Sequence, residues 1–252
     1  MSRVDFVQSL ERGLAVIRSF DAEHPQLTLS EVAARTGLTR ATARRLLLTL
    51  GELGYVSAEG RRFSLTPRVL DIGYAYLSSL NVQQIAQPYL EALSERVHES
   101  VSVTVLDGAD IVYVARVPTK RIMTISLGLG SRLPAYCTSM GRVLLAELAP
   151  DDLGDALPDR LERHTANTVT SVAELAVVLK QVRAQGWAIV DQELEMGLRS
   201  VAAPLRDSSG RAVAAMNIST QVARTPVEQL HEDLVPELVA TAAHISEALA
   251  KR

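Results

Sequence analysis

The stretch that decides the fold runs from residue 28 to residue 51 and reads TLSEVAARTGLTRATARRLLLTLG. Its first four residues form a capping box, in which Thr28 caps a helix and Glu31 bonds back to it. Gly37 is expected to end that helix in a left-handed conformation, and Thr39 is expected to cap the next helix. The segment therefore predicts two short helices separated by a tight turn.

The second of these helices, predicted over residues 40–51, has an apolar back and a basic front. At about 100° per residue, the residues on the back are Ala43, Leu46, Leu47, Leu50 and Leu53. Ala41, Arg44 and Arg45 lie opposite, where the small residue allows a close approach and the arginines can reach base edges or phosphates. This arrangement is typical of a helix that enters the major groove, and a merely solvated helix face is the alternative.

A two-stranded wing is predicted directly after the basic helix. Residues 54–57 and 62–65 have the composition of strands, and residues 58–61 that of a turn. Arg61 and Arg62 at the tip could contact phosphate or the minor groove, unless the hairpin is simply solvated. The candidate DNA-contacting residues are Thr39, Arg40, Ala41, Thr42, Arg44, Arg45, Arg61 and Arg62.

Two further helices flank this predicted winged helix-turn-helix domain of residues 1–67. Upstream, apolar residues at helical spacing predict a helix over residues 5–20, followed by a loop over residues 21–26. Downstream, Pro67 opens a broadly apolar linker helix over residues 68–81. Such a helix packs either on its own domains or on a second subunit, and twofold pairing would place two recognition helices on one face of double-stranded DNA.

Charge is divided unequally along the 252-residue chain, whose net charge is −3. Residues 1–68 hold ten arginines, no lysine and seven acids, which gives +3, so the remainder carries −6. Phosphate binding depends on a local basic face and not on the total charge. The division therefore agrees with a DNA-binding N-terminal part.

The composition fits a two-domain protein of a reducing compartment. Hydrophobic residues make up 47% of the chain, and the single cysteine, Cys137, excludes an internal disulfide and a four-cysteine zinc site. No stretch has the roughly 18 unbroken apolar residues of a membrane span, and the N-terminus resembles no signal or transit peptide. We therefore expect a cytoplasmic protein with no membrane partner, no cofactor and no metal.

Residues 82–252 are predicted to form an α+β domain with a mainly antiparallel sheet and flanking helices. Helices are expected at residues 82–98, 138–148, 171–185 and 227–251. Strands are expected at residues 101–106, 111–117, 122–127, 187–191, 199–205 and 212–220. A turn at residues 107–110 joins the first two strands, and a loop over residues 128–136 leads into the second helix.

The candidate ligand site surrounds the sequence YCTSMG of residues 136–141. A loop of small and hydroxyl residues enters a helix N-terminus there, and the free N–H groups and helix dipole favour a carboxylate. Asn217 and Ser219 are polar residues within apolar strands. They indicate a water-accessible cavity, unless their side chains form hydrogen bonds within the protein. The candidate effector-binding residues are Tyr136, Cys137, Thr138, Ser139, Met140, Asp191, Ser200, Asn217 and Ser219.

With these motifs, the chain resembles the IclR family of bacterial regulators over nearly its whole length. The DNA-binding part matches through SLERGLAVIRSF (9–20), LTLSEVAARTGLTRATARRLLLTLGELGYV (27–56) and FSLTPRVLDIG (63–73). The sensor part matches through PAYCTSMGRVLLA (134–146), GWAIVDQELEMGLRSVAAPLRDSSG (186–210) and AAMNIST (214–220). The details look closest to the regulators of protocatechuate, 4-hydroxybenzoate and β-ketoadipate breakdown.

The resemblance implies a homodimer or a dimer of dimers whose sensor domain is similar to a GAF fold and binds a small organic acid or aromatic compound. Ser139 and Met140 match the helix-entry pair that holds the effector in the family. Asn217 and Ser219 match its paired polar positions, and Asp191 matches an acidic ligand position. The resemblance thus predicts a transcriptional regulator of aromatic catabolism, with a regulator of another pathway that senses a non-aromatic acid as the alternative.

Two other classes of protein are alternatives to a ligand-controlled regulator. In an enzyme, Cys137 would be the nucleophile and His98 or His164 its base, but no nucleophile motif surrounds the cysteine. No pair of histidines has metal-ligand spacing, and a glycine-rich phosphate loop is missing. A purely architectural DNA-binding protein would use its C-terminal domain only as structure, and a ligand-induced rise in melting temperature would argue against it.

Overall fold

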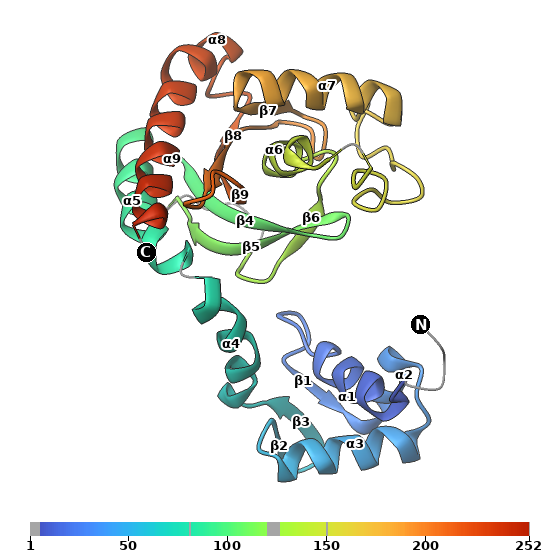
Figure 1. The fold of residues 1–252 in the computed structure, drawn as a ribbon. Helices are drawn as coiled ribbons and strands as arrows, with labels where there is room; N and C mark the ends of the chain where they lie inside the picture. The colour runs from blue at the N-terminus through green and yellow to red at the C-terminus, as the bar shows by residue number, and fades with distance from the viewer. Residues whose placement is uncertain (1–5, 81, 120–126, 150, 252) are drawn as a thin grey trace. The chain divides into compact units, whose positions relative to one another are not determined.

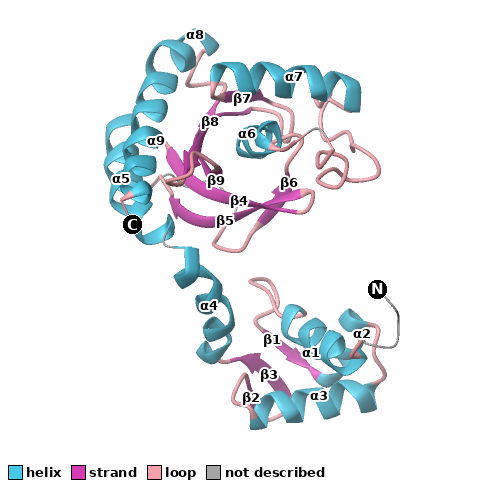
Figure 2. Ribbon diagram, viewed as in Figure 1, coloured by secondary structure: helices cyan, strands magenta, loops and turns pink. Residues whose placement is uncertain are grey.

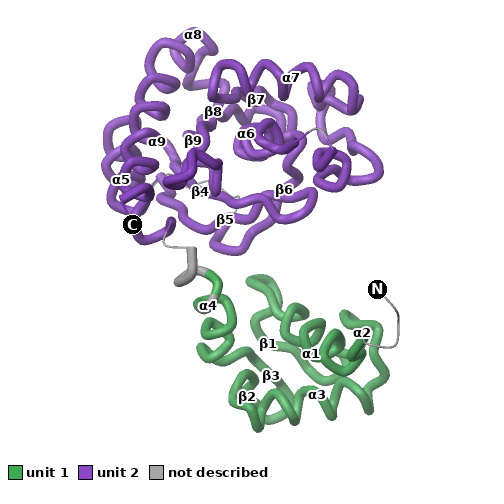
Figure 3. Tube along the Cα trace, in the orientation of Figure 1, with its two compact units in different colours: residues 1–79 green, residues 80–252 purple. Residues whose placement is uncertain are grey.

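The computed structural model describes residues 6–80, 82–119, 127–149 and 151–251. The chain divides into two compact units, residues 1–79 and residues 80–252 (Figure 3). The division falls near the end of the predicted linker helix, and the predicted boundary at residue 67 stays a prediction. None of the described helices combines the length and apolar character that crossing a bilayer requires.

Unit 1 contains three helices and a small sheet in the order β1-β3-β2, followed by α4 (Figure 1). Its elements are α1 (Gln8–Arg18), β1 (Gln26–Thr28), α2 (Leu29–Thr36), α3 (Arg40–Glu52), β2 (Val56–Glu59), β3 (Arg62–Leu65), a 3-10 turn (Pro67–Val69) and α4 (Leu70–Leu80). The buried core consists of Val16, Phe20, Leu27, Val32, Ala33, Ala43, Leu47, Leu50 and Val56. The winged helix-turn-helix expected from the sequence is confirmed.

The predicted caps fix how α3 starts. The Thr28 hydroxyl accepts a hydrogen bond from the Glu31 amide at 3.4 Å, and the Glu31 carboxylate accepts one from the Thr28 amide at 2.7 Å. Gly37 ends α2 with a φ of 66°, and the Thr39 hydroxyl accepts from the Thr42 amide at 3.2 Å. Because the first amides of a helix have no partner within it, these side chains set the turn between α2 and α3.

Two features of unit 1 differ from the prediction. Residues 26–28 form a third strand against β3, with Leu27 buried opposite Phe63, whereas the sequence predicted a loop that runs into a cap. Leu53, predicted on the apolar back of α3, is 52% exposed because α3 ends at Glu52 and the chain turns at Gly54.

Unit 2 is built on a curled six-stranded antiparallel sheet in the order β6-β5-β4-β9-β8-β7. Its strands are β4 (Ser100–Asp107), β5 (Asp110–Val117), β6 (Arg132–Pro134), β7 (Ala188–Asp191), β8 (Leu198–Arg206) and β9 (Ala212–Gln221). Helices α5 (Val82–Val97) and α9 (Val235–Ala250) cover the outside of the sheet, and α6 (Ser139–Glu147) lies within its curl, flanked by α7 (Val172–Gln185) (Figure 2). The α+β class expected from the sequence is confirmed.

Three predicted elements of unit 2 need comment. The loop over residues 128–136 contains β6, which pairs with β5 and forms the edge of the sheet. The strand predicted over residues 122–127 lies, apart from Leu127, outside the described residues. The closing helix is interrupted: α8 (Val227–Gln229) passes into a π-helical turn (Leu230–Leu234) before α9 begins. The interruption directly precedes Pro236, which has no N–H to donate within a helix.

Candidate functional site

The exposed face of α3 carries three arginines. Arg40, Arg44 and Arg45 are exposed, and none of their guanidiniums forms an ion pair within the part of the chain that the structure describes. On the preceding helix, by contrast, Arg35 is held by Asp21. An unpaired guanidinium is available to a phosphate or a guanine edge, so this face has the chemistry of a DNA-reading surface.

The other predicted DNA-contacting residues lie around the start of α3 and on the hairpin. The hydroxyls of Thr39 and Thr42 are 3.0 Å apart at the N-terminus of α3. Ala41 is exposed beside them, and Arg61 and Arg62 are exposed at the turn between β2 and β3. Leu48 is also 49% exposed, and nothing in the structure explains an apolar residue there.

A cavity of about 760 Å³ lies beside the N-terminus of α6, on the inner face of the sheet. This volume is within the usual range of small-molecule sites. Seven of the nine predicted effector residues line it, namely Cys137, Thr138, Ser139, Met140, Ser200, Asn217 and Ser219. The cavity thus brings together the helix entry and the two late strands, which are far apart in the sequence.

Two predicted residues do not line this cavity. Tyr136 is buried beside it, and its hydroxyl donates to the Glu162 carbonyl at 2.6 Å. The Asp191 carboxylate accepts two hydrogen bonds from the Arg199 guanidinium, at 2.9 and 2.7 Å. Both side chains are therefore occupied by internal contacts.

Strand register aligns one row of polar residues across the cavity floor. Ser102 on β4 pairs with Arg116 on β5 and with Asn217 on β9. Directly paired residues of an antiparallel sheet project to the same face, and all three line the cavity. Asn217 is only 5% exposed, and its Oδ1 has no hydrogen-bond partner within the described residues. Native proteins rarely leave a buried polar atom unpaired, which points to a ligand or water at this position.

A second row of polar residues consists of serines. On β4 and β9 it lies two residues away from the first row. Ser219 on β9 pairs with Ser100 on β4 and with Ser200 on β8. The Ser200 hydroxyl also donates to the Ser139 hydroxyl at 2.9 Å, which links the sheet to the start of α6. Sequence reasoning missed Ser100, Ser102 and Arg116, because only the register shows that they share a face with Asn217.

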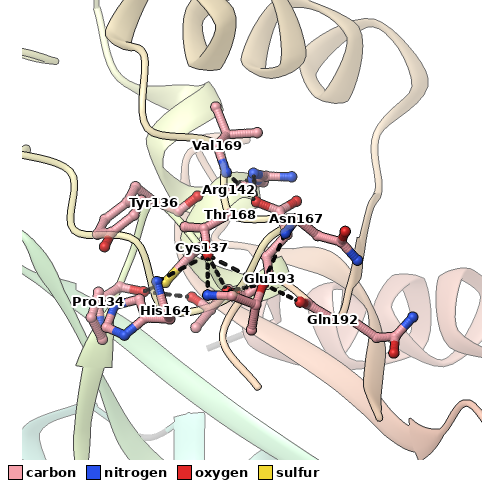
Figure 4. A network of polar contacts seen from close by, with 12 residues as sticks. Pro134, Tyr136, Cys137, Arg142, His164, Asn167, Thr168, Val169, Gln192 and Glu193 are labelled. Atoms are coloured by element: carbon pink, nitrogen blue, oxygen red, sulfur yellow. Dashed lines mark hydrogen bonds and ion pairs between the residues drawn. The ribbon is translucent and has the colours of Figure 1, made fainter. Parts of the chain in front are cut away.

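A buried ion pair joins Arg142 on α6 to Glu193, which lines the cavity (Figure 4). Arg142 donates to the Glu193 carboxylate at 2.6 Å and to the Tyr136 carbonyl at 3.0 Å. The same carboxylate accepts from the Val169 amide at 3.1 Å, and the Thr168 hydroxyl donates to the Glu193 carbonyl at 2.6 Å. Since buried charges are costly unless they are paired and hydrogen-bonded, this network holds α6, the segment before α7 and the β7–β8 connection together.

The Cys137 thiol has the properties of a core side chain. Burial, with the nearby Glu193 carboxylate, raises the pKa of Cys137 to about 12. Its Sγ lies 3.9 Å from the Pro134 carbonyl as a weak donor. A thiol that stays protonated at neutral pH is a poor nucleophile, so this geometry argues against the enzyme alternative.

Comparison with known proteins identifies the relatives of this chain. Residues 9–60 match the IclR helix-turn-helix domain, and residues 74–247 match the C-terminal domain of bacterial IclR transcriptional regulators. The chain is 46% identical to the Pca regulon regulatory protein of Pseudomonas putida, over 94% of this chain and 82% of that protein. It is 34% identical to the p-hydroxybenzoate hydroxylase transcriptional activator of Acinetobacter baylyi, over 94% and 90%.

Two solved structures are similar over the regions that matter here. A protein of Rhodococcus sp. RHA1 is 59% identical, with a TM-score of 0.86 over 97% of this chain and 98% of that one. The inducer-binding domain of the PobR transcription factor from Acinetobacter, a double mutant in complex with 3-hydroxybenzoic acid, is 30% identical. It aligns with a TM-score of 0.61 over 65% of this chain and 96% of that domain.

Proposed function

The chain belongs to the IclR family of bacterial transcriptional regulators, and from this we propose that an aromatic acid bound in the cavity of unit 2 controls its binding to operator DNA. The observation that carries the proposal is the buried Asn217 Oδ1, which has no hydrogen-bond partner within the described residues and belongs to a cavity with polar lining residues. A polar ligand that enters such a cavity can supply the hydrogen bond that this oxygen lacks. The unpaired arginines of α3 supply the DNA-reading surface.

The aromatic class of effector is supported by the names of two relatives. One is the transcriptional activator of p-hydroxybenzoate hydroxylase, and the other holds 3-hydroxybenzoic acid in its inducer-binding domain. The cavity of about 760 Å³ has room for a single aromatic ring with its substituents. We therefore place a hydroxybenzoate, from a pathway of aromatic catabolism, on Ser139, Ser200, Asn217 and Ser219.

We propose control by a shift between two arrangements of the linked units. An effector that binds one arrangement more tightly raises its population, and the spacing of the recognition helices changes with it. Ser139 on α6 and Glu193 on the β7–β8 connection both line the cavity, and both elements belong to the buried Arg142 network. Occupancy of the cavity can thus move α6 against the sheet.

We also propose that the functional unit is a homodimer, able to pair into a dimer of dimers. Val7, directly before α1, and Leu10 and Leu14 on α1 are between 45% and 62% exposed, and on α4 Leu70 and Tyr74 are exposed as well. Contiguous exposed apolar patches are uncommon on monomers, so a second copy is expected to cover these faces. A twofold axis would place two α3 helices on one side of the duplex.

The DNA-reading surface is tested by the Arg44→Ala variant. Loss of a base-reading arginine should weaken binding to a duplex selected from a random pool by about 1–3 kcal/mol, measured by fluorescence anisotropy at fixed salt. Arg211→Ala removes the same charge from an exposed turn of unit 2 and should leave the affinity nearly unchanged. Equal affinity of Arg44→Ala and the unmodified protein would exclude this arginine from recognition.

The effector site is tested by the Ser139→Leu variant. Leucine would fill the cavity at the start of α6, so 4-hydroxybenzoate should no longer raise the melting temperature, whereas duplex binding should persist. Ser208→Leu, on an exposed turn, is the matched control and should keep the full rise. A normal ligand-induced rise in Ser139→Leu would remove this residue from the site.

A further inference from the structure

We infer that the cavity holds its aromatic acid in one orientation, with the carboxylate on Arg116 and a ring hydroxyl on the Asn217 amide. This inference rests on the proposed function and adds to it the chemical role of each end of the cavity. This orientation favours acids whose ring hydroxyl is para to the carboxylate.

Arg116 supplies the unpaired positive charge of the cavity wall. Among the described residues, the other arginine that lines the cavity is Arg224, which donates to both oxygens of Glu99 at 3.1 Å. Arg116 forms no ion pair within the described residues, and its guanidinium lies 6.0 Å from the ring centroid of Tyr113. A guanidinium binds a carboxylate through two parallel hydrogen bonds, so a half-buried, unpaired arginine is the strongest anion site of this wall.

Asn217 supplies the complementary neutral end. Among the described residues its buried Oδ1 has no hydrogen-bond partner, and an amide offers both an acceptor and a donor. A carboxylate only accepts and would leave the Asn217 oxygen unsatisfied. A phenolic hydroxyl carries an O–H and can donate it to the Asn217 oxygen.

The strand register places these two ends at opposite sides of one ring. Arg116 and Asn217 both pair with Ser102, from opposite sides, so their strands are two spacings, or about 10 Å, apart. Ser102 lies between them and is 2% exposed, which leaves a small side chain as the floor under the ring. A benzene ring with polar groups at both ends therefore bridges Arg116 and Asn217.

The competing orientation would place the carboxylate at the first amides of α6. One of these amides, that of Gly141, is already capped by the Thr138 hydroxyl at 3.3 Å. Glu193 also lines the cavity, and its carboxylate accepts from the Arg142 guanidinium at 2.6 Å. A second anion would therefore face an acid there, whereas at Arg116 it faces an unpaired cation.

Three closely related probes separate these orientations by calorimetric titration of the full chain. They are 4-hydroxybenzoate, 4-hydroxybenzamide, which keeps the hydroxyl without the charge, and benzoate, which keeps the charge without the hydroxyl. Arg116→Gln should weaken both acids by about tenfold or more and leave the amide nearly unchanged. Asn217→Ala should weaken both hydroxylated probes by a similar factor and spare benzoate.

Other patterns overturn the assignment. If Arg116→Gln weakens all three probes equally, or spares benzoate, the carboxylate does not lie on Arg116. Arg116→Lys keeps the positive charge and should retain the preference for 4-hydroxybenzoate over 4-hydroxybenzamide. If Arg116→Gln folds poorly, this variant tests whether the carboxylate lies on the cation at residue 116. If none of the probes binds the unmodified chain, the aromatic effector class fails together with the orientation; binding without the expected pattern overturns the orientation alone.

Discussion

Arg142 and Arg132 each donate to a carboxylate at 2.6 Å, but their surroundings differ. The Arg142 side chain is 3% exposed and its partner Glu193 is 9% exposed, whereas for Arg132 and Asp107 the values are 43% and 66%. Removing one member of a buried pair leaves an uncompensated charge, while an exposed charge remains solvated. Although the two ion pairs have equal donor–acceptor distances, their different burial predicts that they contribute unequally to the free energy of unfolding.

Arg142→Met should lower the free energy of unfolding by about 3–5 kcal/mol. Arg132→Met, the matched control, should lower it by about 0–1 kcal/mol. Urea unfolding followed by circular dichroism measures both. A small and equal effect for the two variants would mean that Glu193 finds water or a new partner, and that the network does not hold α6 in place.

Some residues of the site could be predicted from the sequence, and others could not. Asn217 stands out as a polar residue in an apolar strand, and it lines the cavity. Arg116 does not stand out, because an arginine near the end of a strand is usually solvated, and only its pairing with Ser102 places it on the cavity face. Asp191 was predicted as a ligand residue because of its acidic side chain. In the structure its carboxylate pairs with Arg199, and this ion pair links β7 to β8.

At the scale of elements, the start of α6 depends on a close approach of backbones. A β-carbon at Gly141 would overlap the Ala135 carbonyl, because the loop before α6 passes directly over its first turn. Gly141→Ala should therefore displace α6, destabilise unit 2 and abolish the thermal shift with 4-hydroxybenzoate. Gly13→Ala, within α1 and with nothing within 4 Å of a built β-carbon, should be neutral or stabilise by up to about 1 kcal/mol. Unchanged ligand binding in Gly141→Ala would show that the α6 entry does not shape the cavity.

Elements whose signals are local were predicted well, and those that depend on distant partners were not. The capping box at Thr28 and the glycine ends at Gly37 and Gly186 set helix boundaries through bonds within a few residues. The short strands β1 and β6 form because β3 and β5 offer free edges, which no local pattern encodes. The π-helical turn before Pro236 was missed, because the apolar spacing of the closing helix continues across it.

At the scale of the whole molecule, the sequence predicted two functions on two units, and their coupling is the proposed step. Reciprocity requires that an effector which changes DNA affinity by some factor has its own affinity changed by DNA by the same factor. This holds whether the effector strengthens or weakens binding to the operator. The coupling can therefore be measured as the effect of the effector on DNA affinity or as the effect of DNA on effector affinity.

The most direct test is an anisotropy titration of a selected duplex with and without saturating 4-hydroxybenzoate. The unmodified protein should change its duplex affinity by roughly 5–150-fold when the acid is present. Ser139→Leu should bind the duplex with the affinity of the ligand-free protein and show no change. If calorimetry shows that 4-hydroxybenzoate binds the unmodified protein, yet its duplex affinity stays the same, effector control of DNA binding is contradicted.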